Sequence, residues 1–171
     1  MERGSTHTRA GDGRSLRVLG EVVTYKITSE RTGGAYSLFE VVSEPGSGPP
    51  PHVQHREDEA FYVLEGEYEF LDDDGRTTRV GTGSLVYVPK GNLHTYKNVG
   101  TTLGKMLVIQ TPGGLHERFF EAMGQEEAQD KFKPTAHEGL LDAQRNVAIA
   151  AAYGIEILPP SGWRADGKRR D

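Results

Sequence analysis

The chain has 171 residues, of which 35% are hydrophobic and 26% charged, a length typical of one domain with its own core. Its formal net charge of −5 is unsuited to binding the phosphates of nucleic acid, and the lack of cysteine excludes disulfides and thiolate metal ligands. No apolar stretch approaches the roughly 20 residues of a membrane helix, and the polar stretch 1–20 has no signal-peptide pattern, so we expect a cytoplasmic protein without membrane or nucleic-acid partners.

The first two thirds of the chain predict an all-β domain. Residues 1–15 are polar and glycine-rich, which predicts a flexible N-terminal arm. Residues 16–112 alternate short apolar runs with turn residues, a pattern typical of an antiparallel sandwich or barrel. Asp72–Gly75 predicts a hairpin turn, and Pro89 and Pro112 end the strands before them. The expected strands are Val18–Thr28, Tyr36–Val42, Phe61–Leu64, Tyr68–Leu71, Leu85–Val88 and Lys105–Gln110.

Residues 113–160 instead predict a helical extension. Leu115, Phe119 and Met123 have helical spacing, and Gly124 would end that helix. Thr135 and Glu138 have the spacing of a capping box for a second helix, which Gly154 would end, and 155–157 could form a last strand. The expected apolar face of the second helix consists of Leu140, Leu141, Gln144, Val147, Ala148 and Ala151. Residues 161–171 form a basic tail that we expect to be flexible.

The six histidines differ in what their positions predict. His7 lies in the expected arm. His116 and His137 lie at expected helix starts, where a histidinium is electrostatically disfavoured, so both are interpreted as neutral surface or capping groups. His52, His55 and His94 remain as candidate ligands.

The segment around His52 has the features of a ligand-bearing strand. Three prolines, 49–51, stiffen the approach to it. On an extended chain His52 and Gln54 point to one face and His55 to the other. The charged run 56–58 is interpreted as a solvated bend, and Glu59 then heads an apolar strand, where a carboxylate is paired, metal-bound or shifted in pKa.

Two spaced motifs carry a family resemblance. Gly46, His52, Glu59 and Gly66 stand at the spacing of the first cupin motif. The second cupin motif is matched throughout by Gly83, Pro89, Gly91, His94 and Asn98. Residues 16–112 therefore resemble a cupin domain, and the tail resembles that of small single-domain cupins related to quercetin 2,3-dioxygenases.

The resemblance implies a double-stranded β-helix, or jelly-roll barrel, with two C-terminal helices packed outside. It implies one divalent metal ion (Fe, Ni, Mn or Zn) held by His52, Glu59 and His94. The second metal histidine of the family is replaced by Gln54, which could ligate through its amide oxygen, whereas His55 could ligate only through a β-bulge. The resemblance also implies a homodimer formed through an N-terminal edge strand.

The function implied first is a quercetinase-like dioxygenase acting on a small enol or aromatic substrate, with Glu59 as a possible general base. Tyr36, Phe61, Tyr96 and Met106 are candidates for an apolar substrate pocket, although plain core is the favoured interpretation of each one taken by itself. Two alternatives stay open. The same site could serve Lewis-acid isomerisation, cyclisation or decarboxylation, or the chain could be a non-enzymatic small-molecule-binding cupin in which Gln54 marks a degenerate metal site.

Overall fold

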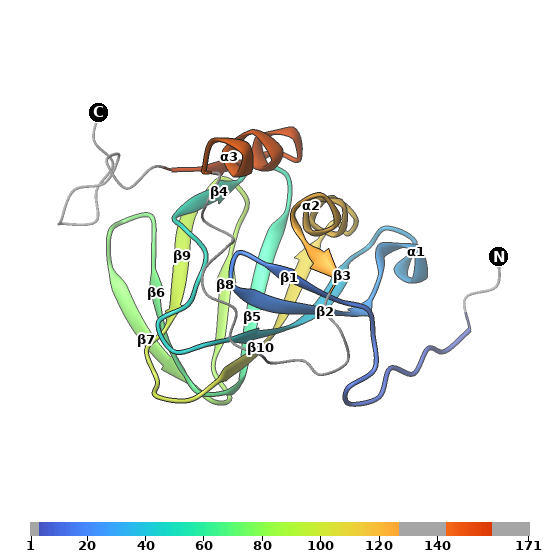
Figure 1. The fold of residues 1–171 in the computed structure, drawn as a ribbon, viewed down its shortest axis with the longest axis horizontal. Helices are drawn as coiled ribbons and strands as arrows, with labels where there is room; N and C mark the ends of the chain where they lie inside the picture. The colour runs from blue at the N-terminus through green and yellow to red at the C-terminus, as the bar shows by residue number, and fades with distance from the viewer. Residues whose placement is uncertain (1–3, 127–142, 159–171) are drawn as a thin grey trace.

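The computed structural model describes residues 4–126 and 143–158, most of which form two antiparallel sheets (Figure 1). The larger sheet has the strand order β11-β1-β2-β3-β10-β5-β8, and the smaller one has the order β12-β4-β9-β6-β7. The strands of the larger sheet are β1 Ser15–Val18, β2 Glu21–Ile27, β3 Ser37–Ser43, β5 Asp58–Glu65, β8 Leu85–Val88, β10 Gly104–Thr111 and β11 Gln125–Glu126. Those of the smaller sheet are β4 His52–Gln54, β6 Glu67–Leu71, β7 Thr77–Gly81, β9 Leu93–Asn98 and β12 Ile155–Ile157.

The core lies between the two sheets because alternate residues of each strand point inward. In β3 every second residue from Ser37 to Ser43 is buried, and β10 shows the same alternation from Gly104 to Gln110. The larger sheet contributes Phe39, Phe61 and Met106 to the core, and the smaller sheet contributes Tyr68, Phe70 and Tyr96. This is the all-β, double-stranded β-helix architecture that the sequence predicts.

The predicted strands are present, with one correction near the start of the barrel. The expected strand Val18–Thr28 is divided, because β1 ends at Val18 and β2 begins at Glu21. Leu19 and Gly20 between them have φ of 50° and 89°, the backbone of a tight two-residue hairpin. The apolar run of the sequence hides this turn, because Leu19 is an unusual residue for a positive φ.

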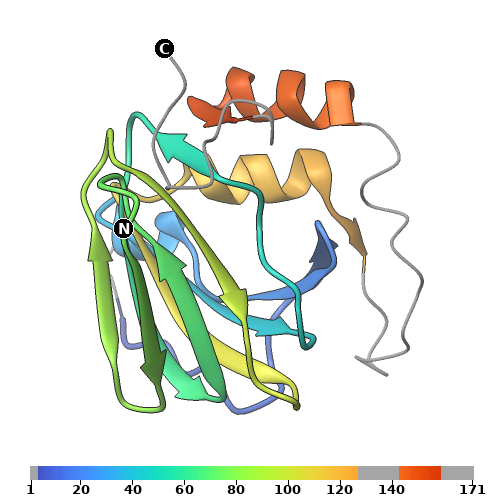
Figure 2. The ribbon, with the colours of Figure 1, turned by 90° about the vertical axis from the view of Figure 1, so that its left-hand side faces the viewer.

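Two helices close one end of the barrel. Helix α2 (Leu115–Met123) ends before Gly124 as predicted, and α3 (Ala143–Ala152) lies beside it at the same end (Figures 1 and 2). Phe120 of α2 packs edge-on against Phe39 in the core, with ring centroids 5.1 Å apart. Phe119, Ala150 and Ile155 form a second small core that joins α2, α3 and β12. A short helix, α1 (Ser29–Thr32), follows β2.

The predicted apolar face of α3 is wrong for the part that the structure describes. Val147 is 41% exposed, and Gln144, Ala148 and Ala151 are also exposed. The side that faces the small core instead carries Ala150 and the partly buried Ile149. The expected capping box at Thr135 and Glu138, His137, and the basic tail 161–171 lie outside the described residues.

The N-terminal segment is held along the barrel. The Thr8 hydroxyl donates to the Lys26 carbonyl oxygen at 2.8 Å, and the Lys26 ammonium donates to the Arg9 carbonyl oxygen at 3.0 Å. Strand β1 is flanked on its outer side by β11, so within the described residues it is not a free sheet edge. An exposed edge at β1 was the physical reason to expect a homodimer through the N-terminal strand, and β11 removes that reason. The homodimer stays a prediction. Among residues 4–126 and 143–158, no helix combines the length and the apolar character needed to cross a membrane.

Candidate metal centre

A pair of histidines is created by strand register in the smaller sheet. His52 on β4 lies directly opposite His94 on β9, so both side chains leave the same face. Their ring centroids are 4.3 Å apart. Gln54, two residues beyond His52 on the same strand, points to that face as well. All three side chains are buried.

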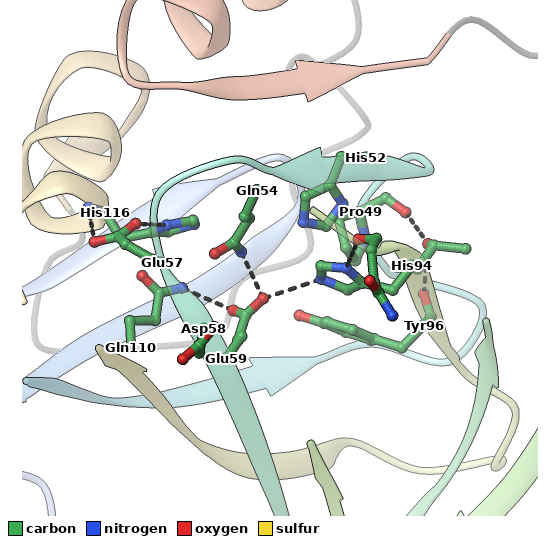
Figure 3. A network of polar contacts seen from close by, with 12 residues as sticks. Pro49, His52, Gln54, Glu57, Asp58, Glu59, His94, Tyr96, Gln110 and His116 are labelled. Carbon is green, nitrogen blue, oxygen red and sulfur yellow. Dashed lines mark hydrogen bonds and ion pairs between the residues drawn. The ribbon is translucent and has the colours of Figure 1, made fainter. Parts of the chain in front are cut away.

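The larger sheet presents a second cross-strand pair toward the histidines. Glu59 on β5 lies opposite Gln110 on β10, and the Gln110 amide donates to the Glu59 carboxylate at 2.7 Å. The other oxygen of Glu59 receives the Gln54 amide at 2.5 Å and contacts His94 Nε2 at 3.0 Å (Figure 3). Glu59 therefore links the two sheets across the barrel interior.

Each histidine is oriented by a backbone carbonyl. His52 Nδ1 donates to the carbonyl oxygen of Pro50 at 3.0 Å, and His94 Nδ1 donates to that of Asn92 at 3.3 Å. This contact fixes the tautomer and leaves Nε2 as the ring nitrogen that faces the centre. The stiff proline segment thus both aims the His52 strand and supplies the carbonyl that orients its ring.

The donor set fits a divalent metal ion. One ligand atom each from His52, Glu59 and His94 lies within 4.8 Å of the others, and all three residues are buried. Within the described part of the chain, the amide oxygens of Gln54 and Gln110 are buried without a hydrogen-bond partner. An unpaired buried oxygen is costly, but the amide nitrogen of Gln54, and not its oxygen, faces Glu59 (Figure 3). Gln54 would therefore ligate a cation at the centre only if its amide turned over. Two imidazoles and a carboxylate form a mixed nitrogen and oxygen set of the kind that Fe, Mn, Ni and Zn accept.

Electrostatics keep two of the donors, His52 and Glu59, in the forms that bind metal. Burial and the positive charge of His94 lower the pKa of His52 from 6.5 to about 3, so its imidazole is neutral near pH 7. Burial alone would raise the pKa of Glu59, but the hydrogen bond and charge of His94 outweigh it and lower that pKa to about 2. Since His94 Nδ1 already donates to Asn92, its contact with Glu59 through Nε2 needs a second ring proton, which a bound cation would displace.

A cavity adjoins this centre. His52 and Glu59 line it together with Phe61 and Tyr96, two of the residues predicted for an apolar pocket. The other two candidates, Tyr36 and Met106, do not line this cavity. Tyr36 is 38% exposed and lies away from the cavity wall, because it precedes β3 at the surface. Met106 is fully buried in the barrel core and does not reach the cavity. Phe119, Phe120 and Ile155 from the helical end complete much of the apolar lining.

The remaining histidines have separate places. His55 points away from the centre, where its Nε2 lies 3.1 Å from the Glu156 carboxylate and its side chain is 51% exposed. Of the surface and capping roles predicted for His116, the structure excludes the surface role, because His116 is buried and its Nδ1 lies 2.9 Å from the Glu57 carboxylate. Glu57 is likewise buried instead of solvated and also accepts the His116 backbone N–H at 3.2 Å.

Comparison with known proteins shows which proteins the chain resembles. The family model described as "Cupin domain" matches residues 39–110. An uncharacterized protein of Methanocaldococcus jannaschii is 29% identical over 106 residues, which span 62% of this chain and 79% of that protein. A germin-like protein of Arabidopsis thaliana is 34% identical over 84 residues, 45% of this chain, and the match spans 38% of its own length.

Solved structures share the same fold. The crystal structure of a predicted oxalate decarboxylase from Thermotoga maritima is similar with a TM-score of 0.58 and 20% identity. The similarity covers 63% of this chain and 99% of that one. At this identity the likeness concerns the fold, and the activity has to be argued from the site.

The cupin motif residues outside the centre have structural roles. Gly66 and Gly91 occupy turns with φ of 90° and 86°, a backbone that residues with a Cβ rarely adopt. Asn98 is fully buried, and its amide donates to the carbonyl oxygens of Ser43 and Thr102 at 3.0 and 2.9 Å. It therefore holds the turn after β9 and is not part of the ligand set.

Sequence reasoning missed three buried groups near the centre. Gln110 could have been found, because it continues the inward alternation of Met106 and Val108 and is polar where the pattern is apolar. The partnership of Glu57 with His116 joins residues 59 apart, and Glu21 opens a strand without any motif around it. Neither of these carries a local signal.

Proposed function

We propose that this cupin is a metal-dependent dioxygenase acting on a small enol or phenol. The observation that carries the proposal is the set of two histidines and one carboxylate, with ligand atoms within 4.8 Å of one another at the wall of an apolar cavity. Such a set with open positions is typical of non-haem iron oxygenases. A bound ion would supply Lewis acidity and, if it is redox-active, the electrons for oxygen chemistry.

The protein's own residues would bind and deprotonate the substrate. Phe61, Phe119 and Phe120 offer aromatic faces that hold a planar ring and exclude water. Glu59 lines the cavity and would accept the enol proton, while the amide groups of Gln54 and Gln110 keep its carboxylate fixed. Because the pKa of Glu59 is lowered to about 2, it is a weak base, and this role requires an acidic substrate hydroxyl.

The cavity size favours a compact substrate. The cavity volume is about 60 Å³. Since one water needs about 10–15 Å³ of such a volume, the cavity has room for only a few water molecules. This space suits a single-ring enol or phenol better than a three-ring flavonol. Within the proposal, the substrate is therefore smaller than that of a quercetinase.

A second candidate is non-oxidative chemistry at the same centre, such as isomerisation, cyclisation or decarboxylation. It is favoured by Glu21, a second buried carboxyl on the cavity wall whose pKa burial raises to about 7. A carboxyl with such a pKa can exchange protons near neutral pH. The fold alone does not choose between the two candidates.

Oxygen uptake distinguishes the two candidates. The full-length protein is stripped with a chelator, reloaded with Fe²⁺, Mn²⁺, Ni²⁺ or Zn²⁺, and mixed with catechol, tropolone or quercetin in an oxygen electrode. We expect metal-dependent uptake with a small enol or phenol, lost in Glu59→Gln and kept in the matched surface variant Glu65→Gln. Substrate turnover without oxygen uptake, accompanied by deuterium incorporation from solvent, would overturn the dioxygenase and support the second candidate.

A further inference from the structure

Glu21 is a buried carboxyl in the same cavity that the metal centre does not use. It is 5% exposed, stands at the start of β2, and lines the cavity together with His52 and Glu59. Its surroundings on the cavity wall are apolar and include Val18, Val23 and Val41. A carboxyl in such a place is costly unless several donors satisfy it.

The protein supplies Glu21 with fewer donors than a carboxylate can accept. In the described part of the chain, the hydrogen bonds to it come from the Ser43 hydroxyl on one oxygen and the Tyr96 hydroxyl, at 2.7 Å, on the other. An ionised carboxylate has about four lone-pair sites. The Glu21 carboxylate can therefore accept further hydrogen bonds, and it lies on the wall of the cavity.

The two polar ends of the cavity are joined by aromatic rings. Tyr96, which donates to Glu21, packs edge-on against Phe61 with centroids 5.4 Å apart. Phe61 in turn packs against His94 of the metal centre at 6.0 Å. A ligand lying along this aromatic wall would meet metal ligands at one end and Glu21 at the other.

We propose that Glu21 binds a hydroxyl group of the ligand, so that the cavity takes a small, largely apolar molecule with one oxygen at the metal centre and a hydroxyl at Glu21. This inference rests on the proposed function in that it takes the cavity as the substrate site. It adds a specificity-determining residue and narrows the substrate class to molecules with two separated oxygen functions.

Binding of a hydroxyl to Glu21 carries a pH dependence. A hydroxyl donates best to the ionised carboxylate, so affinity rises as the pH increases through the pKa of Glu21, which burial raises to about 7. The titratable groups that face Glu21 are Tyr96 on β9, Tyr68 on β6 through Ser43, Glu59 on β5, His52 on β4 and His116 on α2. Comparison with Glu21→Gln separates the titration of Glu21 from theirs.

The test uses two probes that differ by one hydroxyl. 4-Fluorophenol and fluorobenzene are titrated into full-length, chelator-treated protein and followed by fluorine NMR. A hydrogen bond to a charged group predicts that 4-fluorophenol binds at least about tenfold more tightly than fluorobenzene above pH 7, and that this preference shrinks below it. In Glu21→Gln the preference should fall to a few-fold and lose its pH dependence, whereas Glu65→Gln should behave like the native chain.

Each other result overturns the inference. Equal binding of the two probes, binding of neither, or a preference that persists in Glu21→Gln would show that Glu21 only fills the core. A preference that arises only after metal is restored would assign the hydroxyl to the metal centre. If Glu21→Gln fails to fold, the native pH series still tests the inference, because a preference that does not change through pH 7 overturns it. Because the assay is metal-free, its failure is distinct from a failure of the oxygen-uptake assay.

Discussion

Two buried pairs of histidine and glutamate lie close together in this protein and differ in what surrounds them. His94 Nε2 lies 3.0 Å from the Glu59 carboxylate inside the barrel. His116 Nδ1 lies 2.9 Å from the carboxylate of Glu57, which directly precedes β5 and contacts the start of helix α2. In the first pair His94 uses Nε2, the nitrogen that a metal would take, and a second imidazole lies beside it. In the second pair His116 uses Nδ1, and Glu57 also accepts a backbone N–H of the helix.

The comparison shows that residue identity and burial do not decide the role of such a pair. The Glu57 carboxylate satisfies the first turn of α2 and ties that helix to the barrel, which is a capping role. The Glu59 carboxylate instead receives two side-chain amides and faces a cavity. One pair stabilises the helical end, and the other is arranged to bind.

The largest expected effect follows from removing His94. We expect His94→Ala to lose the metal that the native chain retains, near one ion per chain, because two donors cannot hold a divalent ion in competition with water. Elemental mass spectrometry of the purified proteins measures this. His55→Ala is the matched control and should keep its metal, since His55 points away from the centre. Equal metal in the native and His94→Ala proteins would contradict the assignment.

Breaking the other pair should affect stability and leave metal content alone. Glu57→Ala leaves His116 buried without its partner, which should lower the free energy of unfolding by about 3 kcal/mol. Urea denaturation measures the loss. Glu57→Gln keeps an acceptor for the helix N–H and should lose less. If Glu57→Ala loses metal while its stability is unchanged, the two pairs have been assigned the wrong way round.

A third buried carboxyl, Glu21, sharpens the comparison because it has no histidine partner. Burial raises its pKa from 4.5 to about 7, so between these values the folded chain holds a proton that the unfolded chain has released. The free energy of unfolding therefore falls as pH rises through this window, by up to about 3 kcal/mol, and levels off above it. The difference between native and Glu21→Gln in metal-free urea denaturation isolates this contribution. A difference that does not change with pH would contradict the raised pKa.

The smallest effect is expected at the surface. His55 and Glu156 form an exposed pair at 3.1 Å. Because water screens such pairs, His55→Ala should change the free energy of unfolding by less than about 1 kcal/mol. Thermal denaturation of the two proteins in low and high salt measures it. If His55→Ala lowers the free energy of unfolding as much as Glu57→Ala does, solvent exposure does not explain the difference in stability between the two pairs.

The sequence by itself determined the all-β class, most strand positions, helix α2 and the identity of His52, Glu59 and His94 as one cluster. The class, the strands and the helix follow from local rules, since alternation marks strands and proline and glycine end them. The cluster of three residues followed from the resemblance of the two spaced motifs to those of the cupins. The placement of Gln54 with His52 and away from His55 also follows, because a strand alternates its faces.

Only the tertiary structure decided which polar residues meet across the barrel. The contacts of Glu59 with Gln110, of Glu57 with His116 and of Glu21 with Tyr96 depend on strand register and sheet packing between distant segments. The exposed side of α3 and the surface position of Tyr36 were decided in the same way, because burial depends on which neighbour an element packs against. Local pattern sets which residues are available, and packing sets which of them share a site.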